Sequence, residues 1–335
     1  MRIFAVPVVA AITLLLFAGC TTTPPAPRPY VSPTKAQIEV AQSVGINATE
    51  LDLLLNKPLY EMKPEEVHRY LGWLAKSEPD LRKRVAHLAR QNINQPYELY
   101  LLGEFPYEVT DDQPLFDLTK SDCVVYVEHT YAMALSASWE EFFWVLQRIR
   151  YKDGVIGVVT RNHYTETDWN PNNAWLVTDI TQALGGVRTQ TYPLKVDRKR
   201  FLKNRYKLDR EIPIEDVKET YVPKEMVAEV ESQLKDGDFV NIISGKGGGK
   251  WASHVGMVVI DQSAGSNGKR MFIHSQEPMV REETFQRFVE RANEREARVA
   301  ATGVEPQRLH GFKFFRLNEN PDVPPMKAQP RPGRH

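Results

Sequence analysis

Cysteine is nearly absent from this chain. Cys20 and Cys123 are the only two cysteines among 335 residues. Cys20 ends an N-terminal apolar segment, so Cys123 is the only thiol left in the folded part of the protein, which therefore cannot form an internal disulfide. A lone thiol is a liability in an oxidising compartment, so Cys123 is the first candidate for chemistry. The alternative is a small, buried and inert side chain.

The chain also lacks an excess of charge of either sign. It has 43 basic and 43 acidic residues, giving a formal net charge of +0 at pH 7. No global basic field points to nucleic acid, so we expect no nucleic-acid partner, and no acidic excess points to disorder. The charge-free apolar run at residues 3–18 is shorter than the roughly 20 residues that span a bilayer.

The N-terminus instead has the features of an export signal. Arg2 precedes the apolar run, and Ala18, Gly19 and Cys20 follow it in a pattern that resembles the bacterial lipobox. We therefore predict that residues 1–19 are a lipoprotein signal peptide and that Cys20 carries lipid. Thr21 stands where aspartate would signal retention in the inner membrane, which favours the periplasmic face of the outer membrane. The alternative is an ordinary signal peptide or a short anchor.

Composition divides the rest of the chain into four segments. Residues 20–33 are rich in Thr and Pro and predict an extended tether. Helix-start signals and helical spacing of apolar residues predict a helical lobe over residues 34–95. The main domain follows at residues 96–320, and the proline-rich residues 321–335 predict a disordered tail.

Helical patterns come first in the main domain and strand patterns second. Residues 123–135 are almost continuously apolar and predict a buried helix, and Ser138 with Glu141 forms a capping box for a helix over residues 139–150. Three alternating or apolar runs predict strands at residues 238–243, 254–260 and 269–274. This order predicts an α+β fold in which the helix that starts at Cys123 packs on an antiparallel sheet.

That arrangement would bring a thiol and two histidines together. Unpaired amides and the dipole at a helix start favour a thiolate at Cys123. His254, which opens a strand after a glycine-rich loop, is the candidate base, and His274 at the end of the next strand is the candidate orienting group. Gln276 is the alternative for the third position, because a register slip of one residue reverses the face on which a side chain lies.

The sequence gives weaker signals for two other kinds of site, a zinc site and a phosphate-binding loop. His163, His254 and His274 could bind zinc, but no pair has helical ligand spacing and a metal would compete with the thiol, so we expect no metal or other cofactor. The glycines at residues 247–249 with Lys250 lack the spacing of a phosphate-binding loop and predict a mobile rim loop.

Several local sequences together resemble one known family. Residues 101–317 are similar to the N-acetylmuramoyl-L-alanine amidase-like family of bacterial cell-wall hydrolases, within the NlpC-type papain-like cysteine peptidases. The resemblance is carried by residues 103–107 (GEFPY), 122–128 (DCVVYVE), 149–154 (IRYKDG), 160–164 (TRNHY), 168–169 (DW) and 253–256 (SHVG).

The resemblance implies a permuted papain-like (NlpC-type) fold for residues 96–320, with the catalytic Cys at a helix N-terminus. It also implies Cys123 as nucleophile, His254 as base and His274 as the third polar group. The substrate-binding residues that it implies are Asp122, Tyr107, Arg161, His163 and Tyr164. For the segment that contains Arg161, a loop held by Arg161 hydrogen bonds and Trp169 packing is the alternative.

The resulting hypothesis is a cysteine-dependent peptidoglycan amidase that cleaves the bond between N-acetylmuramic acid and L-alanine. Peptidoglycan or muropeptides would be its partner, and the N-terminal lipid would hold it to the membrane. A stem-peptide endopeptidase of the same fold is the closest alternative. A non-hydrolytic muropeptide-binding lipoprotein is the second, and acyl transfer to an amine stays open.

Overall fold

The computed structural model describes residues 30–265 and 268–329. The predicted signal peptide, Cys20 and residues 20–29 of the predicted tether lie outside this part of the chain. Helices come first along the sequence and most of the strands come later. These strands form an antiparallel sheet, so the α+β class predicted from the element order is confirmed.

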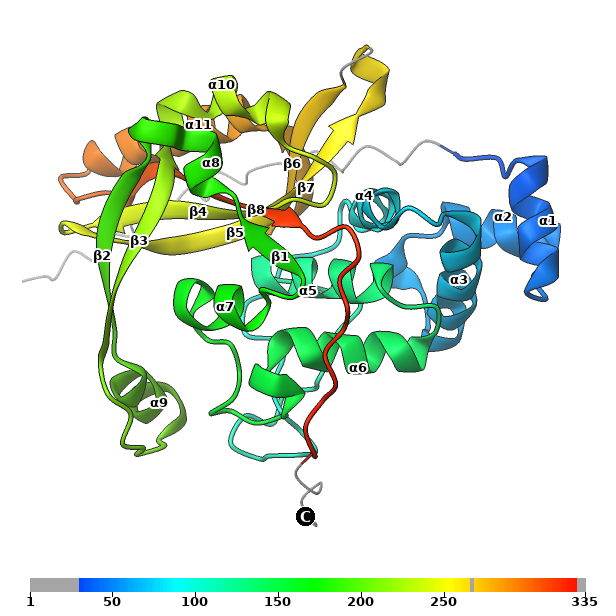
Figure 1. Ribbon diagram of the computed structural model, residues 1–335, viewed down its shortest axis with the longest axis horizontal. Coiled ribbons are helices and arrows are strands. Elements are labelled where there is room, and N and C mark those ends of the chain that lie inside the picture. Colours follow the sequence, from blue (N-terminus) through cyan, green and yellow to red (C-terminus); the bar gives the residue numbers. More distant parts are fainter. Residues whose placement is uncertain (1–29, 266–267, 330–335) are drawn as a thin grey trace, which may run out of the picture.

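The N-terminal half is mostly helical (Figure 1). Thr34 begins the first helix through a capping box with Gln37, as the Ser/Thr-x-x-Glu/Gln pattern favours. The larger helices of this half are α1 (Lys35–Ser43), α2 (Ala48–Asn56), α3 (Pro64–Ser77), α4 (Leu81–Gln91), α5 (Cys123–Ala134) and α6 (Trp139–Arg150).

One apolar core joins these helices to the sheet. Trp73 of α3, Tyr126 of α5 and Phe239 of the sheet are each about 1% exposed and belong to the same cluster. Each buried aromatic side chain contributes a large apolar area, so this shared core stabilises α1–α4 against the rest of the protein. The helical lobe predicted over residues 34–95 therefore does not have a core of its own.

The sheet has the strand order β2-β3-β8-β4-β5-β6-β7, with β1 paired to β8 and every pairing antiparallel. Its strands are β1 (Val177–Asp179), β2 (Gln190–Val196), β3 (Glu215–Pro223), β4 (Phe239–Lys246), β5 (Gly249–Asp261), β6 (Lys269–Gln276), β7 (Met279–Thr284) and β8 (Arg308–Leu317).

Helices cover both faces of the central strands (Figure 1). Successive side chains of a strand point to opposite faces. Val255 of β5 accordingly packs in the cluster that contains α5, whereas Val258 packs in the cluster that contains Phe285 and Phe288 of α11 (Phe285–Ala300). The sheet therefore separates α5 from α11, and an end of this sandwich carries the candidate site.

The β2–β3 pair extends beyond the body of the sheet and carries α9 (Arg198–Tyr206) at its end (Figure 1). Tyr192 of β2 is 1% exposed and donates a hydrogen bond to Glu166. The remaining short helices are α7 (Asn170–Asn172), α8 (Thr181–Gly185) and α10 (Val227–Val230).

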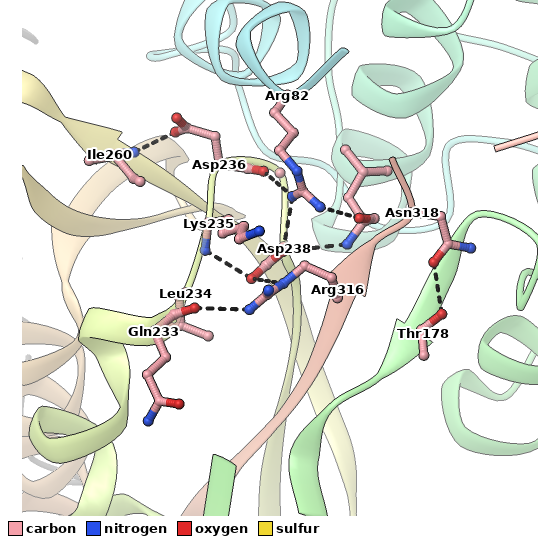
Figure 2. Close-up of polar contacts among 12 residues, drawn as sticks. Arg82, Thr178, Gln233, Leu234, Lys235, Asp236, Asp238, Ile260, Arg316 and Asn318 are labelled. Carbon is pink, nitrogen blue, oxygen red and sulfur yellow. Dashed lines mark hydrogen bonds and ion pairs between the residues drawn. The ribbon is translucent and has the colours of Figure 1, made fainter. Parts of the chain in front are cut away.

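A buried ion pair network fixes α4 to the sheet (Figure 2). Arg82 of α4 donates to the backbone carbonyl of Asp236, 2.9 Å away, and to the Asp238 carboxylate, 3.3 Å away. Arg316 of β8 pairs with the other oxygen of Asp238 at 3.0 Å. Asp238 is 0% exposed, so two cations offset the cost of burying its charge.

The proline-rich C-terminal segment differs from expectation up to residue 329. It has no helix or strand but passes across α6 in the view of Figure 1 (red trace), and Gln329 bonds to Gly154 and Ile156, which follow α6 in sequence. Lys327 also pairs with Asp153 at 2.6 Å. These contacts hold residues 321–329 on the body, where sequence composition predicts a loose tail. Within residues 30–265 and 268–329, no helix is long and apolar enough to cross a membrane.

Candidate functional site

The segment that leads into α5 is bonded to β6. The Ser121 and Ser275 hydroxyl oxygens lie 3.0 Å apart, and Ser275 donates a hydrogen bond to the Ser121 carbonyl at 2.8 Å. Both serines are at most 1% exposed. Because Ser121 is two residues before Cys123 and Ser275 follows His274, this link brings the start of α5 to the end of β6.

Asp122 begins α5 and places Cys123 in its first turn. The Asp122 carboxylate accepts hydrogen bonds from the amides of Val124 and Val125, each at 2.9 Å. This is the N-cap arrangement that aspartate favours, and it leaves the following residue at the first helical position. Sequence resemblance predicts that Asp122 faces substrate, whereas in the structure one of its oxygens is committed to capping the helix.

Partly buried Cys123 lies in surroundings that oppose the ionisation that the helix start favours. Burial is the main cause, and the Asp122 charge adds to it, raising the pKa of Cys123 from 9.0 to about 12. The amides of Val255, Cys123 and Val124 act in the opposite direction. Desolvation and a neighbouring carboxylate therefore outweigh the helix terminus here.

The adjacent strands β5 and β6 align two imidazoles and a carboxylate. His254 Nε2 lies 2.8 Å from His274 Nδ1, and His274 Nε2 lies 2.9 Å from a carboxylate oxygen of Glu283 in β7. The same Glu283 oxygen is 2.9 Å from the Arg291 guanidinium of α11. The side-by-side placement of His254 and His274 that the hairpin predicts is thus present.

The Glu283 carboxylate determines which nitrogen donates and which accepts along this series of hydrogen bonds. Glu283 only accepts, so His274 Nε2 carries the proton and His274 Nδ1 is an acceptor. His274 Nδ1 then accepts from His254 Nε2–H, which leaves His254 Nδ1 without a proton. A neutral imidazole with an unprotonated Nδ1 is the form that a general base requires.

Both imidazoles are neutral because they are buried. Burial, followed by neighbouring positive charge, lowers the pKa of His254 and of His274 well below 6.5. His274 is 0% exposed, and His254 stacks on Phe288 of α11 at a ring separation of 6.3 Å. Burial therefore favours the neutral form of both imidazoles.

The thiol meets β5 at the peptide that joins His254 to Val255, because the Val255 amide acts on it. Among the described residues, no hydrogen bond joins the thiol to the His254 imidazole. Hydrogen bonds of this kind are often long without substrate and tighten when it binds.

Tyr97, rather than Tyr107, is the tyrosine near the thiol. Tyr97 bridges to Ser121, and burial together with the charge of Cys123 raises the pKa of its phenol to about 12. Tyr107 is half-buried against a separate cluster that includes Leu115 and Tyr151. The structure therefore does not bring the Tyr107 predicted from resemblance to the start of α5.

Arg161 holds its own loop together. Its guanidinium pairs with Glu104, which is 0% exposed, and with Asp111 at 2.9 Å. Trp169, 2% exposed, packs on Phe239 at a ring separation of 4.4 Å. These contacts match the alternative interpretation of this segment, a loop fixed by Arg161 hydrogen bonds and Trp169 packing.

His163 and Tyr164 lie beside α9, in another part of the molecule from the imidazole pair. His163 Nε2 bonds to the Val158 carbonyl at 2.7 Å, and burial lowers the pKa of His163 to about 3. The ring of Tyr164 lies 5.6 Å from that of Phe201. His163 is thus not placed with His254 and His274, and the described part of the chain contains no cluster of three or more His, Cys, Asp or Glu suited to a metal ion.

Comparison with family models identifies the chain. The model of the N-acetylmuramoyl-L-alanine amidase-like family matches residues 87–294, more than half of the sequence. The chain belongs to this family. The match begins within α4 and ends within α11, so it includes the start of α5, both imidazoles and Glu283.

Solved structures share the fold of this family member at low sequence identity. A Legionella pneumophila protein is 19% identical with a TM-score of 0.64, covering 78% of this chain and 97% of its own. An N-acetylmuramoyl-L-alanine amidase of Bacteroides uniformis is 21% identical with a TM-score of 0.54, covering 71% of this chain and 99% of its own. Comparison with curated proteins found no significant match.

Sequence reasoning missed two residues of this site. Glu283 becomes visible only when β6 and β7 are paired, since Phe272 lies opposite it and His274 is diagonal to it. Tyr97 reaches the thiol through an isolated bridge to Ser121, a contact with no periodic signal. The proline at position 96, where the helical pattern ends, was the one sequence feature that marked this segment.

Proposed function

We propose that this family member is a peptidoglycan hydrolase that cleaves the amide bond between N-acetylmuramic acid and L-alanine through a Cys123 acyl-enzyme. Family membership supports an amidase that acts on peptidoglycan. The observation that supports the mechanism is the hydrogen-bonded series His254, His274 and Glu283, together with the Val255 amide, next to His254 in sequence, which acts on the Cys123 thiol.

The first step of the reaction forms a tetrahedral intermediate in which sulfur is bonded to the substrate carbon. His254 Nδ1 takes the proton from the Cys123 thiol as sulfur attacks the carbonyl carbon of the muramyl group. The carbonyl oxygen becomes an oxyanion, which the backbone N–H of Cys123 can stabilise, because the first amides of a helix have no partner within it. In other enzymes such a donor contributes about 2.7–4 kcal/mol.

The remaining steps release the stem peptide, which leaves the thioester, and then restore the enzyme. His254 gives its proton to the nitrogen of L-alanine, the carbon–nitrogen bond breaks, and the stem peptide leaves as a free amine. Water then loses a proton to His254 and attacks the thioester. The carbon–sulfur bond breaks, the thiol regains the proton from His254, and the muramyl carboxylate is released.

The raised pKa of the Cys123 thiol sets a condition on this chemistry. A thiol with a raised pKa transfers its proton only when the His254 imidazole and the substrate carbonyl are both in place. His274 and Glu283 act through His254, since they hold its Nε2–H and stabilise the positive charge that forms on its ring. We therefore assign His254 as the base and His274 and Glu283 as positioning residues.

The proposal includes the finer fold and the location. We propose the permuted papain-like fold of NlpC-type peptidases for residues 96–320. We also propose export as a lipoprotein anchored through Cys20 at the periplasmic face of the outer membrane. The lipobox-like residues 18–20 and the Thr/Pro-rich segment after them support this location.

Product masses from defined muropeptides test the bond that is cut. The full-length protein is incubated with a purified N-acetylmuramyl pentapeptide, and products are identified by mass spectrometry. We expect a free stem peptide that begins with L-alanine and a muramyl sugar with a free carboxylate. A cut within the stem would instead identify an endopeptidase, and bound but intact muropeptide would identify a binding protein.

A matched pair of histidine variants tests the base. His254→Ala should lower kcat by about 10²–10⁴-fold, the contribution typical of general base catalysis. His310→Ala removes a half-buried histidine that lies on β8 beside Tyr221 and outside the site, so it should retain wild-type kcat. Equal activity of the two variants would exclude His254 as the base.

A further inference from the structure

Helix α11 carries arginines along one side. Arg287, Arg291, Arg295 and Arg298 are spaced by four, four and three residues, which places them on neighbouring turns of one helix face. Phe288 lies between the first two and is buried against the sheet. The arginine face therefore borders the side of α11 that packs on the sheet.

This face lines a cavity of about 510 Å³. Its wall also includes Tyr97, Gln276 and Glu277. That volume lies within the range of roughly 300–1,000 Å³ in which small-molecule sites are usually found. The cavity is therefore large enough for part of a peptide.

The cavity adjoins the candidate catalytic centre from two sides. Tyr97 forms a β-bridge with Ser121, which lies two residues before Cys123. Phe288, also in the cavity wall, stacks on the His254 ring. A substrate that presents its scissile carbonyl to the Cys123 thiol can therefore extend into this cavity.

The first two arginines of the row already have ion-pair partners. Arg287 pairs with Glu290 at 3.3 Å and Glu294 at 3.1 Å, and Arg291 pairs with Glu283 at 2.9 Å. Their charge is largely neutralised within the protein, so they offer little to a ligand.

Arg295 and Arg298 differ from these two. In the part of the chain that the structure describes, neither has an ion-pair or hydrogen-bond partner. Glu277 is the remaining acidic side chain of the cavity wall once Glu294 is paired with Arg287. The charged groups of the cavity wall that have no ion-pair partner are thus two guanidinium groups and one carboxylate, which leaves an excess of positive charge in the cavity.

We propose that Arg295 and Arg298 bind a carboxylate of the substrate's stem peptide in this cavity. The inference rests on the proposed function, because it takes the substrate to be a muropeptide. Guanidinium groups bind carboxylates through paired, charge-assisted hydrogen bonds, and two arginines without an ion-pair partner in this cavity fit the acidic residue that follows L-alanine in the stem.

A binding measurement tests this site without hydrolysis. Full-length Cys123→Ala protein is titrated calorimetrically with the dipeptide L-alanyl-D-glutamate and with its diamide, which has the same shape but no carboxylates. We expect the acid to bind at least about tenfold more tightly than the diamide, the discrimination that a charged hydrogen-bonded pair provides.

Arginine variants assign that discrimination to α11. In the Cys123→Ala background, R295Q/R298Q should bind the acid and the diamide with equal affinity. R295K/R298K, which keeps the charge but loses the planar fork, should retain an intermediate preference. R308Q removes an exposed arginine of β8 that lies outside the cavity and should bind as the parent does.

The outcomes separate this proposal from the proposed function. Equal affinity for acid and diamide, or a preference that persists in R295Q/R298Q, would overturn the carboxylate site whether or not wild-type protein cleaves muropeptides. Suppose instead that wild-type protein cleaves a different bond, and that the Cys123→Ala parent prefers the acid whereas R295Q/R298Q does not. That result would overturn the amidase and keep the carboxylate site.

Discussion

Replacing Asp122 by Asn should make the Cys123 thiol easier to ionise. The Asp122 charge is the second cause, after burial, of the rise in the pKa of this thiol from 9.0 to about 12. That rise corresponds to about 4 kcal/mol in favour of the thiol over the thiolate. Asparagine caps a helix about as well as aspartate, so D122N removes the charge and keeps the start of α5.

The size of the effect can be worked out. Loss of a neighbouring carboxylate lowers a pKa by about one unit or more, which gives about ten times more thiolate at pH 8. A thiolate of lower pKa is also less nucleophilic, by about threefold for one unit. The net expectation is an alkylation rate about three times that of wild type.

The assay is alkylation by iodoacetamide between pH 7 and 11, with the labelled residue identified by peptide mass mapping. Asp80→Asn is the matched control, because Asp80 caps α4 through the amides of Arg82 and Lys83 and should not affect the thiol. A wild-type alkylation pKa at or below about 8.5, the value of free cysteine, or an unchanged rate in D122N, would refute this account of the thiol.

Three further predictions follow from the same contacts. Glu283→Ala should lower kcat by about 10²-fold and leave KM nearly unchanged, because His274 loses the acceptor that fixes its tautomer. Steady-state kinetics and the pH–rate profile test this prediction, and a change in KM alone would contradict it. His129→Phe should make stability less sensitive to acid: burial lowers the pKa of His129 from 6.5 to about 3, so its neutral form stabilises the fold above pH 6.5 and this contribution is lost as pH falls towards 3. Between pH 7 and 5, urea denaturation should show a loss of stability smaller by about 2 kcal/mol in this variant, whereas an equal or larger loss would exclude the assignment. Arg161→Gln should cost about 3–5 kcal/mol of stability, since Glu104 is left as a buried charge, and an unchanged urea midpoint would contradict this role.

Local signals allowed the secondary structure near the site to be predicted from sequence. The helix predicted over residues 139–150 is α6 (Trp139–Arg150), because the Ser138 cap and the apolar spacing both act within a few residues. Residues 269–274 likewise fall in β6, whose apolar run ends at His274. Such features depend on neighbours in sequence and are readable without the fold.

Contacts between distant segments could not be predicted in this way. The Glu283–His274 bond depends on the register of β6 and β7, and the approach of Tyr97 to the thiol depends on a bridge to Ser121. Neither leaves a periodic trace in the sequence. The packing of Tyr107 against the cluster of Leu115 and Tyr151 likewise depends on segments distant in sequence, which a local resemblance does not contain.

The ionisation of the Cys123 thiol depends on more than the helix start. The helix start and its dipole are visible in the sequence, and they favour a thiolate at Cys123. Burial is a property of the whole fold, and its effect on the thiol is larger than that of the amides. The capping role of Asp122, in contrast, could have been inferred, because aspartate before a helical apolar run is a strong N-cap signal.

Hydrolysis of the muramyl–L-alanine bond by Cys123→Ala protein is the most direct test of the central claim. The account predicts a loss of at least about a thousandfold in kcat/KM relative to wild type, with an unchanged urea midpoint, because the nucleophile itself is removed. Full hydrolysis by a folded Cys123→Ala protein would contradict the thiol mechanism.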